Sequence, residues 1–224
     1  MNILEAVENR HSVRKYTKEA IKPEVVQALQ EEISRWNQLA GLHIQLITDE
    51  PEAFGSFLTH YGQFSNVKNY IAIVGPQGAL LDEQAGYCGE QLVLKAQQLG
   101  LNTCWVVATY SKKKSRCIVN DGEKRVCVIA VGYGVSSGKV HKSKPLCALC
   151  SNQSGSAVPD WFHKGMQAAM LAPTAMNQQK FLITLMPENQ VSIKPTGRLY
   201  TQIDVGIVKC HFEIGAGKEY FSWV

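Results

Sequence analysis

Two short stretches carry the residues best suited to binding a ligand. The first, RHSVR at residues 10–14, places two guanidinium groups, an imidazole and a hydroxyl directly after an apolar turn. Guanidinium groups stay protonated and bind phosphate oxygens through paired hydrogen bonds, so this pattern favours a phosphate ligand. The second, APTAMNQQ at residues 172–179, follows an apolar helical pattern. Its small residues let the backbone approach a flat ligand, and its amides can hydrogen-bond to the edge of a heterocycle.

Each stretch also has a simpler interpretation when it is taken alone. The first could be a surface arginine cluster near a helix end, paired with Glu5 or Glu8. The second could be a turn that ends a helix, because Pro173 breaks the preceding helix and Asn177 can cap it. Residue types and spacing leave both alternatives open.

In this order the two stretches resemble the FMN-dependent nitroreductase family, whose members carry an R-x-S-x-R/K segment and an A-P-S/T-x-x-N-x-Q segment. In most members the two segments come from different subunits of a dimer, whereas here they lie about 160 residues apart in one chain. The resemblance covers nearly the whole chain and points to the branch in which one chain holds two half-domains. It implies an α+β nitroreductase-like fold whose half-domains, residues 1–150 and 151–224, mimic the family's homodimer.

The resemblance also implies a role for each segment. The 10–14 segment would bind the FMN phosphate and ribityl chain, and Arg14 would lie near N1 and the C2 carbonyl of the flavin. Residues 107–109 would pass the N5 edge, where a backbone N–H orients the ring. The glycine usual in that loop is missing, so the identity of the donor stays open. Residues 141–144 resemble a basic segment that closes on the phosphate, although a solvated linker would carry the same charges. The residues expected to bind FMN are Arg10, His11, Ser12, Arg14, Val107, Ala108, Thr109, Lys142, Lys144, Thr174, Ala175, Asn177 and Gln178.

The implied activity is that of a nitroreductase-type oxidoreductase. Electrons would pass from NAD(P)H or another donor, through flavin N5, to a small electron-poor acceptor such as a nitro compound or quinone. No side chain needs to act as an acid or base, because the cofactor carries the chemistry. The alternative is an FMN-binding carrier, sensor or partner-binding protein without turnover. One chain would form the internal pseudo-dimer, so a monomer is expected.

Composition excludes several other classes of protein. The chain has 224 residues, of which 45% are hydrophobic and 19% charged, and a formal net charge of +4. The basic run at residues 112–116 is too short for a nucleic-acid stripe and lacks interleaved aromatics. The sequence contains no apolar run long enough to span a membrane and no pattern of a signal peptide, so a cytoplasmic protein is expected. A dinucleotide fingerprint is also missing, since the glycines at 132 and 134 lack a third.

Seven cysteines are present, an odd count that argues against a complete disulfide framework. Cysteines 88, 104, 127 and 210 lie in apolar segments and are expected in the core. Cys147 and Cys150 form a lone C-x-x-C in a linker pattern. A metal site needs more ligands than this motif supplies, so we expect loop thiols and no metal.

Hydrophobic periodicity predicts alternating helices and strands around one central linker. The best linker is residues 134–156, which are rich in Gly, Ser, Lys and Pro. The second half repeats the first in outline, with glycines near the start of the long helix in each half. Helices are predicted over residues 1–9, 23–40, 81–99, 159–172 and 203–214, with a further candidate over 54–60. Strands are predicted over residues 42–47, 70–75, 126–132 and 181–185, and residues 103–107 are predicted to form a loop or a short edge strand.

Overall fold

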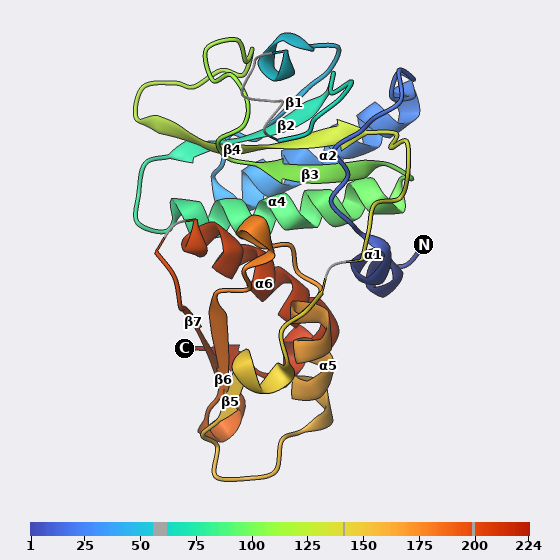
Figure 1. Ribbon diagram of the computed structural model, residues 1–224. Helices are drawn as coiled ribbons and strands as arrows, with labels where there is room; N and C mark the ends of the chain where they lie inside the picture. The colour runs from blue at the N-terminus through green and yellow to red at the C-terminus, as the bar shows by residue number, and fades with distance from the viewer. Residues whose placement is uncertain (56–61, 141, 199) are drawn as a thin grey trace. The chain divides into compact units, whose positions relative to one another are not determined.

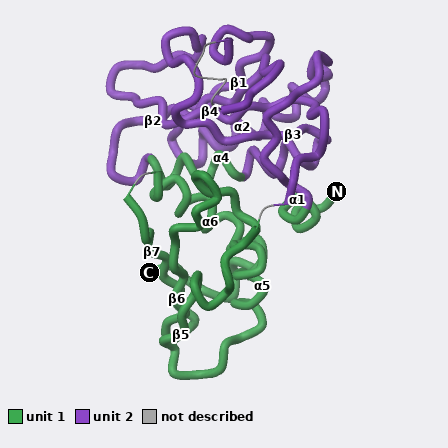
Figure 2. The backbone as a smooth tube through the Cα atoms, viewed as in Figure 1, with its two compact units in different colours: residues 1–8, 82–90, 141–224 green, residues 9–81, 91–140 purple. Residues whose placement is uncertain are grey.

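The computed structural model describes residues 1–55, 62–140, 142–198 and 200–224 (Figure 1). The chain divides into two compact units (Figure 2): unit 1 comprises residues 1–8, 82–90 and 141–224, and unit 2 comprises residues 9–81 and 91–140. Each unit contains a four-stranded sheet. This confirms an α+β fold with two half-domains in one chain. Both units are discontinuous, because helix α4 (Leu81–Gln98) contributes residues to each.

The sheet of unit 2 is antiparallel, with the order β1-β2-β4-β3. Its strands are β1 (Gln45–Ile47), β2 (Tyr70–Pro76), β3 (Asn102–Val106) and β4 (Glu123–Gly132). The two central strands, β2 and β4, are apolar on both faces and buried along most of their length, as near-continuous apolar runs predict. Of the two alternatives predicted for residues 103–107, a loop or a short edge strand, the structure shows the edge strand, β3.

Helix α2 (Pro23–Ala40) packs against β1 and buries Leu29 and Ile33. Pro23 stands in its first turn, where the missing N–H costs no helical hydrogen bond. Gly41 ends the helix with φ 63°, a left-handed conformation that glycine adopts without strain. Both ends of this helix were therefore predictable from residue type.

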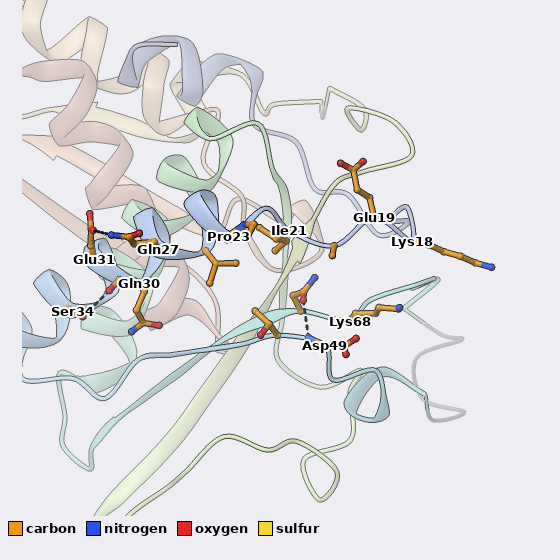
Figure 3. A pocket seen from close by; sticks show the side chains of 14 residues that line it. Lys18, Glu19, Ile21, Pro23, Gln27, Gln30, Glu31, Ser34, Asp49 and Lys68 are labelled. Carbon is orange, nitrogen blue, oxygen red and sulfur yellow. Dashed lines mark hydrogen bonds between the residues drawn. The ribbon is translucent and has the colours of Figure 1, made fainter.

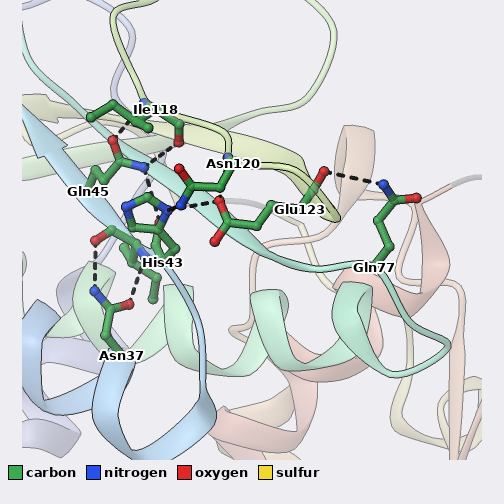
Figure 4. Close-up of polar contacts among 8 residues, drawn as sticks. Asn37, His43, Gln45, Gln77, Ile118, Asn120 and Glu123 are labelled. Atoms are coloured by element: carbon green, nitrogen blue, oxygen red, sulfur yellow. Dashed lines mark hydrogen bonds and ion pairs between the residues drawn. The ribbon is translucent and has the colours of Figure 1, made fainter.

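Strand β1 is shorter than the predicted strand over residues 42–47, and Figure 4 shows the contacts around its start. Asn37, on α2, donates its amide N–H to the carbonyl oxygen of Ile44 at 2.9 Å and accepts the Ile44 N–H at 2.7 Å. The backbone of Ile44 is thereby bonded to a side chain rather than to a neighbouring strand. The backbone still reaches β2 on the other side of Ile44, since the His43 N–H donates to the Val74 carbonyl oxygen at 2.8 Å. Gln45, the first residue of β1, exchanges two hydrogen bonds with the backbone of Ile118. The loop before β4 is thus fixed to the first strand.

The sheet of unit 1 has the order β5-β6-β7-β8 and mixes parallel and antiparallel pairs. Its strands are β5 (Cys150–Asn152), β6 (Phe181–Leu185), β7 (Gln190–Pro195) and β8 (Ser222–Trp223). Its helices are α1 (Ile3–Asn9, of which residues 3–8 belong to unit 1), α5 (Asp160–Ala169) and α6 (Thr201–Ala216). Short 3-10 helices lie at η1 (Glu52–Phe54, in unit 2), η2 (Leu146–Ala148), η3 (Ala175–Asn177), η4 (Pro187–Asn189) and η5 (Lys218–Tyr220).

Two glycines permit a close approach of helix backbones inside unit 1. A Cβ on Gly86 of α4 would meet the carbonyl oxygen of Ile203, and a Cβ on Gly206 of α6 would meet the carbonyl oxygen of Glu83. These glycines stand near the starts of the two helices that the sequence relates to each other. Their lack of a side chain therefore has a packing reason in both helices.

Strands β5, β7 and β8 were not predicted, and the predicted helix over 159–172 ends earlier, at Ala169. The helix candidate over 54–60 falls mainly on residues 56–61, which lie outside the described residues. None of the helices formed by the described residues is long and apolar enough to cross a membrane.

Candidate functional site

The RHSVR segment lies in unit 2, directly after α1. Asn2 and Glu5 start this helix with a reciprocal cap, in which each residue's backbone N–H donates to the other's side chain. Beyond Asn9 the chain leaves the helix and runs extended past β3, where the Val13 N–H donates to the Thr103 carbonyl oxygen at 2.9 Å.

Backbone hydrogen bonds fix the segment further along. The Ser65 N–H donates to the Arg14 carbonyl oxygen at 2.9 Å, and the Val135 N–H donates to the Lys15 carbonyl oxygen, also at 2.9 Å. Gly138 packs against the segment so closely that a Cβ there would stand 2.7 Å from the Cβ of His11. The backbone of the cluster is therefore held in place by three other parts of unit 2.

The side chains of the cluster differ in exposure. Arg10 is only 4% exposed, His11 and Ser12 are half-buried, and Arg14 is exposed. Arg10 is therefore not part of a solvated surface cluster. Burial raises the pKa of the Cys104 thiol, while the nearby charges of Arg14 and Arg10 and a hydrogen bond with Ser12 act to lower it. The charges of Arg14 and Arg10 therefore both act on Cys104 of β3.

The predicted N5 segment follows β3 immediately. Val107, Ala108 and Thr109 form bends in which Ala108 is exposed and the other two are half-buried. Gly62 approaches this segment, because a Cβ there would lie 2.9 Å from the Thr109 hydroxyl oxygen. Residues 62–65 therefore contact both Arg14 and Thr109. No role was predicted for residues 62–65 from their residue types.

The second predicted segment lies in unit 1 and has an unusual backbone. Thr174 is extended, and then Met176, Asn177 and Gln179 have positive φ values of 51°, 53° and 44°. Non-glycine residues adopt this region at a cost of about 1–3 kcal/mol each and persist in it only where neighbours enforce it. Such strain concentrates at functional sites.

Gln179 is one neighbour that enforces the bend. Its side chain, 1% exposed, accepts the Lys144 N–H at 2.6 Å and donates to the Met170 carbonyl oxygen at 3.1 Å. Its backbone N–H donates to the Thr174 hydroxyl oxygen at 3.0 Å. Gln179 is not among the residues expected to bind FMN. Its hydrogen bonds nevertheless hold the bend that contains several of them.

The predicted basic segment lies beside this bend. The Asn177 side-chain amide donates to the Lys142 carbonyl oxygen at 2.9 Å, and the Lys144 ammonium donates to the Gln179 carbonyl oxygen at 3.0 Å. Both lysine side chains reach the surface. Unit 1 therefore brings together two segments that are separated by some thirty residues in the sequence and that the sequence assigned to one ligand. Residue 141 lies outside the described residues.

Asp204, in the first turn of α6, supports the predicted segment through a contact that the sequence did not reveal. Its carboxylate is 5% exposed and accepts the Ala175 N–H at 3.0 and 3.2 Å to its two oxygens. Burial raises the pKa of Asp204 to about 6, against a smaller opposite effect of the Ala175 hydrogen bond. An acidic residue between Ile203 and Val205, in the mainly apolar first half of α6, is the signal that could have found it.

A separate cavity of about 1020 Å³ lies in unit 2 beside α2 (Figure 3). Gln27, Gln30 and Ser34 line it from the helix, and Asp49 and Lys68 line it from the loops that flank the sheet. None of the residues that the sequence predicts for FMN lines this cavity. It is therefore not the predicted site. Among the described residues, no three of His, Cys, Asp and Glu gather as metal ligands.

Comparisons with known proteins give the family. The family model "Putative TM nitroreductase" matches residues 2–216. A putative nitroreductase from Thermotoga maritima has a TM-score of 0.69 at 23% identity, covering 98% of this chain and 85% of its own. A putative nitroreductase from Desulfovibrio desulfuricans, solved in complex with FMN, has a TM-score of 0.52 at 21% identity, covering 66% of this chain and 94% of its own.

A third structure is the putative NADH dehydrogenase/NAD(P)H nitroreductase from Parabacteroides distasonis, with a TM-score of 0.50 at 19% identity, covering 66% of this chain and 97% of its own. No curated protein matches the chain. These likenesses agree in fold with the family match, which spans nearly the whole sequence. The chain belongs to the nitroreductase family, in the group described as Putative TM nitroreductase.

Proposed function

We propose that this protein is an FMN-dependent oxidoreductase of nitroreductase type. The observation that carries the proposal is the fixed cluster of residues 10–14, in which a buried arginine, a hydroxyl and an imidazole stand on an immobilised backbone. Such a donor set fits a phosphate monoester, the group that distinguishes FMN from riboflavin. The FMN-bound structure of the relative from Desulfovibrio desulfuricans supports this choice of ligand.

The proposed division of roles follows the exposure and chemistry of the side chains. Arg10, with His11 and Ser12, binds the phosphate and ribityl chain, and Lys142 and Lys144 add positive charge there. Arg14, exposed and permanently charged, lies at the pyrimidine edge of the ring. Thr174, Ala175, Asn177 and Gln178 contact the flavin from unit 1. A backbone N–H from Val107, Ala108 or Thr109 orients the ring at N5.

Bound FMN supplies the redox chemistry, by taking a hydride from a reduced nicotinamide and passing electrons to an electron-poor acceptor. The protein positions the cofactor and supplies the electric field of its charged groups. The strained bend is fixed before any ligand arrives, so the amide donors need no reorganisation on binding. A fixed guanidinium near the ring favours the form of the ring that carries more negative charge. One chain supplies all these groups, so we propose a monomer with a single flavin site.

The test is purification from flavin-replete cells followed by anaerobic stopped-flow mixing with NADH and, separately, NADPH. We expect flavin absorption bands in the purified protein and their bleaching by at least one nicotinamide. Addition of a nitro compound or quinone should then restore the bands. Protein that neither retains nor rebinds FMN would overturn the proposal. Protein that binds FMN but is not bleached by either nicotinamide would instead be a flavin carrier or sensor.

A further inference from the structure

The C-x-x-C motif of unit 1 forms a tight turn that the flavin chemistry does not use. Cys147 lies in η2, and Cys150 begins β5. Between them Ala148 is helical and Leu149 has φ −117° and ψ −14°, close to a type I turn. Cα atoms at the two ends of such a turn lie less than about 7 Å apart. A disulfide that forms without backbone movement requires Cα atoms no more than about 7 Å apart, and this turn meets that condition.

The two thiols have different environments. Cys147 is exposed, whereas Cys150 is half-buried. Burial raises the pKa of the Cys150 thiol, and the nearby Cys147 adds to this effect. Cys147 is therefore the accessible nucleophile, and Cys150 is placed to act second, because a thiolate attacks only when it is both ionised and reachable.

Both cysteines line the same cavity, which has a volume of about 260 Å³. His163 also lines it, and most of the remaining wall is apolar and includes Val158, Phe162 and Met166. The turn thus faces a recess rather than open solvent alone. Within the described part of the chain no third ligand joins this pair to make a metal site.

The other cysteines of the chain do not offer such a pair. Cys88, Cys104, Cys127 and Cys210 are buried, and the Cys117 sulfur accepts a hydrogen bond from Arg125 at 2.9 Å. Of the seven cysteines, all of which lie within the described residues, only Cys147 is exposed. Oxidants in solution therefore reach the thiols of this turn more readily than the buried thiols of the core.

We propose that Cys147 and Cys150 form a redox-active dithiol whose substrates are low-molecular-weight disulfides. The Cys147 thiolate attacks one sulfur of the small disulfide, forms a mixed disulfide and releases the first small thiolate. The Cys150 thiolate then attacks the Cys147 sulfur and releases the second. The dithiol loses two electrons and two protons, and the small disulfide becomes two thiols. This site is independent of the proposed flavin chemistry.

The test uses full-length protein, reduced and desalted under argon, and then exposed to oxidised glutathione before acid quenching, alkylation and tryptic mass spectrometry. Cleavage after Lys142 and Lys164 places both cysteines on one peptide, because Pro145 blocks cleavage after Lys144. We expect this peptide to lose two hydrogens and to escape alkylation, while the buried cysteines stay reduced. The reaction should reverse with dithiothreitol.

Two matched variants separate the roles of the two thiols. Cys150→Ser should accumulate a glutathione adduct on Cys147, since nothing resolves it. Cys147→Ser should leave Cys150 largely unmodified over the same time. Wild-type protein in which the pair stays reduced, or in which glutathionylated Cys147 accumulates without closure, would overturn the proposal. Oxidation of Cys150 at an equal rate in Cys147→Ser would also overturn it. Thermal melts of both variants exclude misfolding as the cause.

Discussion

Single residues decide whether the proposed site can bind and tune a flavin, and Arg14 is the residue whose effect is most separable from folding. Its side chain is exposed, while its backbone is held by Ser65. Removing the side chain therefore leaves the segment in place. The guanidinium contributes a fixed positive charge that cannot be titrated away.

We predict that Arg14→Ala lowers the reduction potential of bound FMN by more than it weakens FMN binding. A positive charge near the ring stabilises the reduced, more negative flavin, and its loss favours the oxidised form. The measurement is a spectroscopic redox titration of wild type, Arg14→Ala and the charge-conserving Arg14→Lys, which should fall between them. Equal reduction potentials in all three proteins would show that Arg14 does not lie at the edge of the flavin ring.

Asp204 predicts a pH dependence of stability. Burial raises its pKa from an ordinary 3.8 to about 6 in the folded protein. Between about pH 4 and 6 the folded state holds a proton that the unfolded state has lost, so the free energy of unfolding falls as the pH rises through this range. The difference in pKa corresponds to about 3 kcal/mol.

Urea unfolding of wild type and Asp204→Asn across this pH range measures that contribution. Asparagine keeps the shape and an oxygen for the Ala175 N–H but does not ionise. We expect the stability of wild type relative to the variant to be greatest below about pH 4, to decline up to about pH 6 and then to stay level. Parallel curves over the whole range would show that Asp204 does not titrate in this way.

At the scale of elements, the helix crossing in unit 1 depends on the absence of two side chains. Gly86 and Gly206 each face a backbone carbonyl of the opposite helix. We predict that Gly86→Ala lowers the free energy of unfolding by about 1–3 kcal/mol, as overpacking does. Alanine is the better helix former by about 1 kcal/mol, so propensity alone would predict the opposite sign.

Gly78→Ala is the control for this substitution, because a Cβ at Gly78 would meet nothing within 4 Å. Chemical denaturation of the three proteins gives the comparison. Gly78→Ala should match wild type. A Gly86→Ala protein as stable as the control would show that the helices can separate without loss.

The elements that the sequence predicted well are those fixed by local chemistry. Pro23 and Gly41 mark the ends of α2, and the apolar runs of β2 and β4 need no partner to be recognised. Strands β5 and β8 escaped prediction because they are three and two residues long and exist only through pairing with distant segments. Strand β7 did carry a signal, since Val191 and Ile193 alternate with polar residues.

The same distinction between local chemistry and contacts with distant segments applies to the candidate site. The sequence predicts Arg10 and Asn177 as flavin contacts because the order of the motifs is kept within one chain, and this assignment stays a prediction. It could not identify Asp204 as a support of the bend, because that contact joins residues 29 positions apart. Gln179 likewise looks like one amide among several until its burial and its bonds to Lys144 and Met170 are known.

At the scale of the whole molecule, the predicted flavin contacts are shared between the two units. Residues 10–14 and 107–109 belong to unit 2, and residues 142–144 and 174–178 belong to unit 1. The resemblance to FMN-dependent nitroreductases assigns both sets of residues to one FMN. Each group should then affect a different part of the ligand, since Arg10 is assigned to the phosphate and Asn177 to the ring.

The most direct test is calorimetric titration of the flavin-free protein with FMN and with riboflavin, which lacks the phosphate, in wild type, Arg10→Ala and Asn177→Ala. Wild type should prefer FMN. Arg10→Ala should lose about 10- to 100-fold in affinity for FMN, the equivalent of one charged hydrogen bond, and little for riboflavin. Asn177→Ala should weaken both ligands by a similar factor. Thermal melts establish that both variants remain folded. An unchanged FMN affinity in folded Arg10→Ala, or a wild type that does not distinguish the two flavins, would contradict the account.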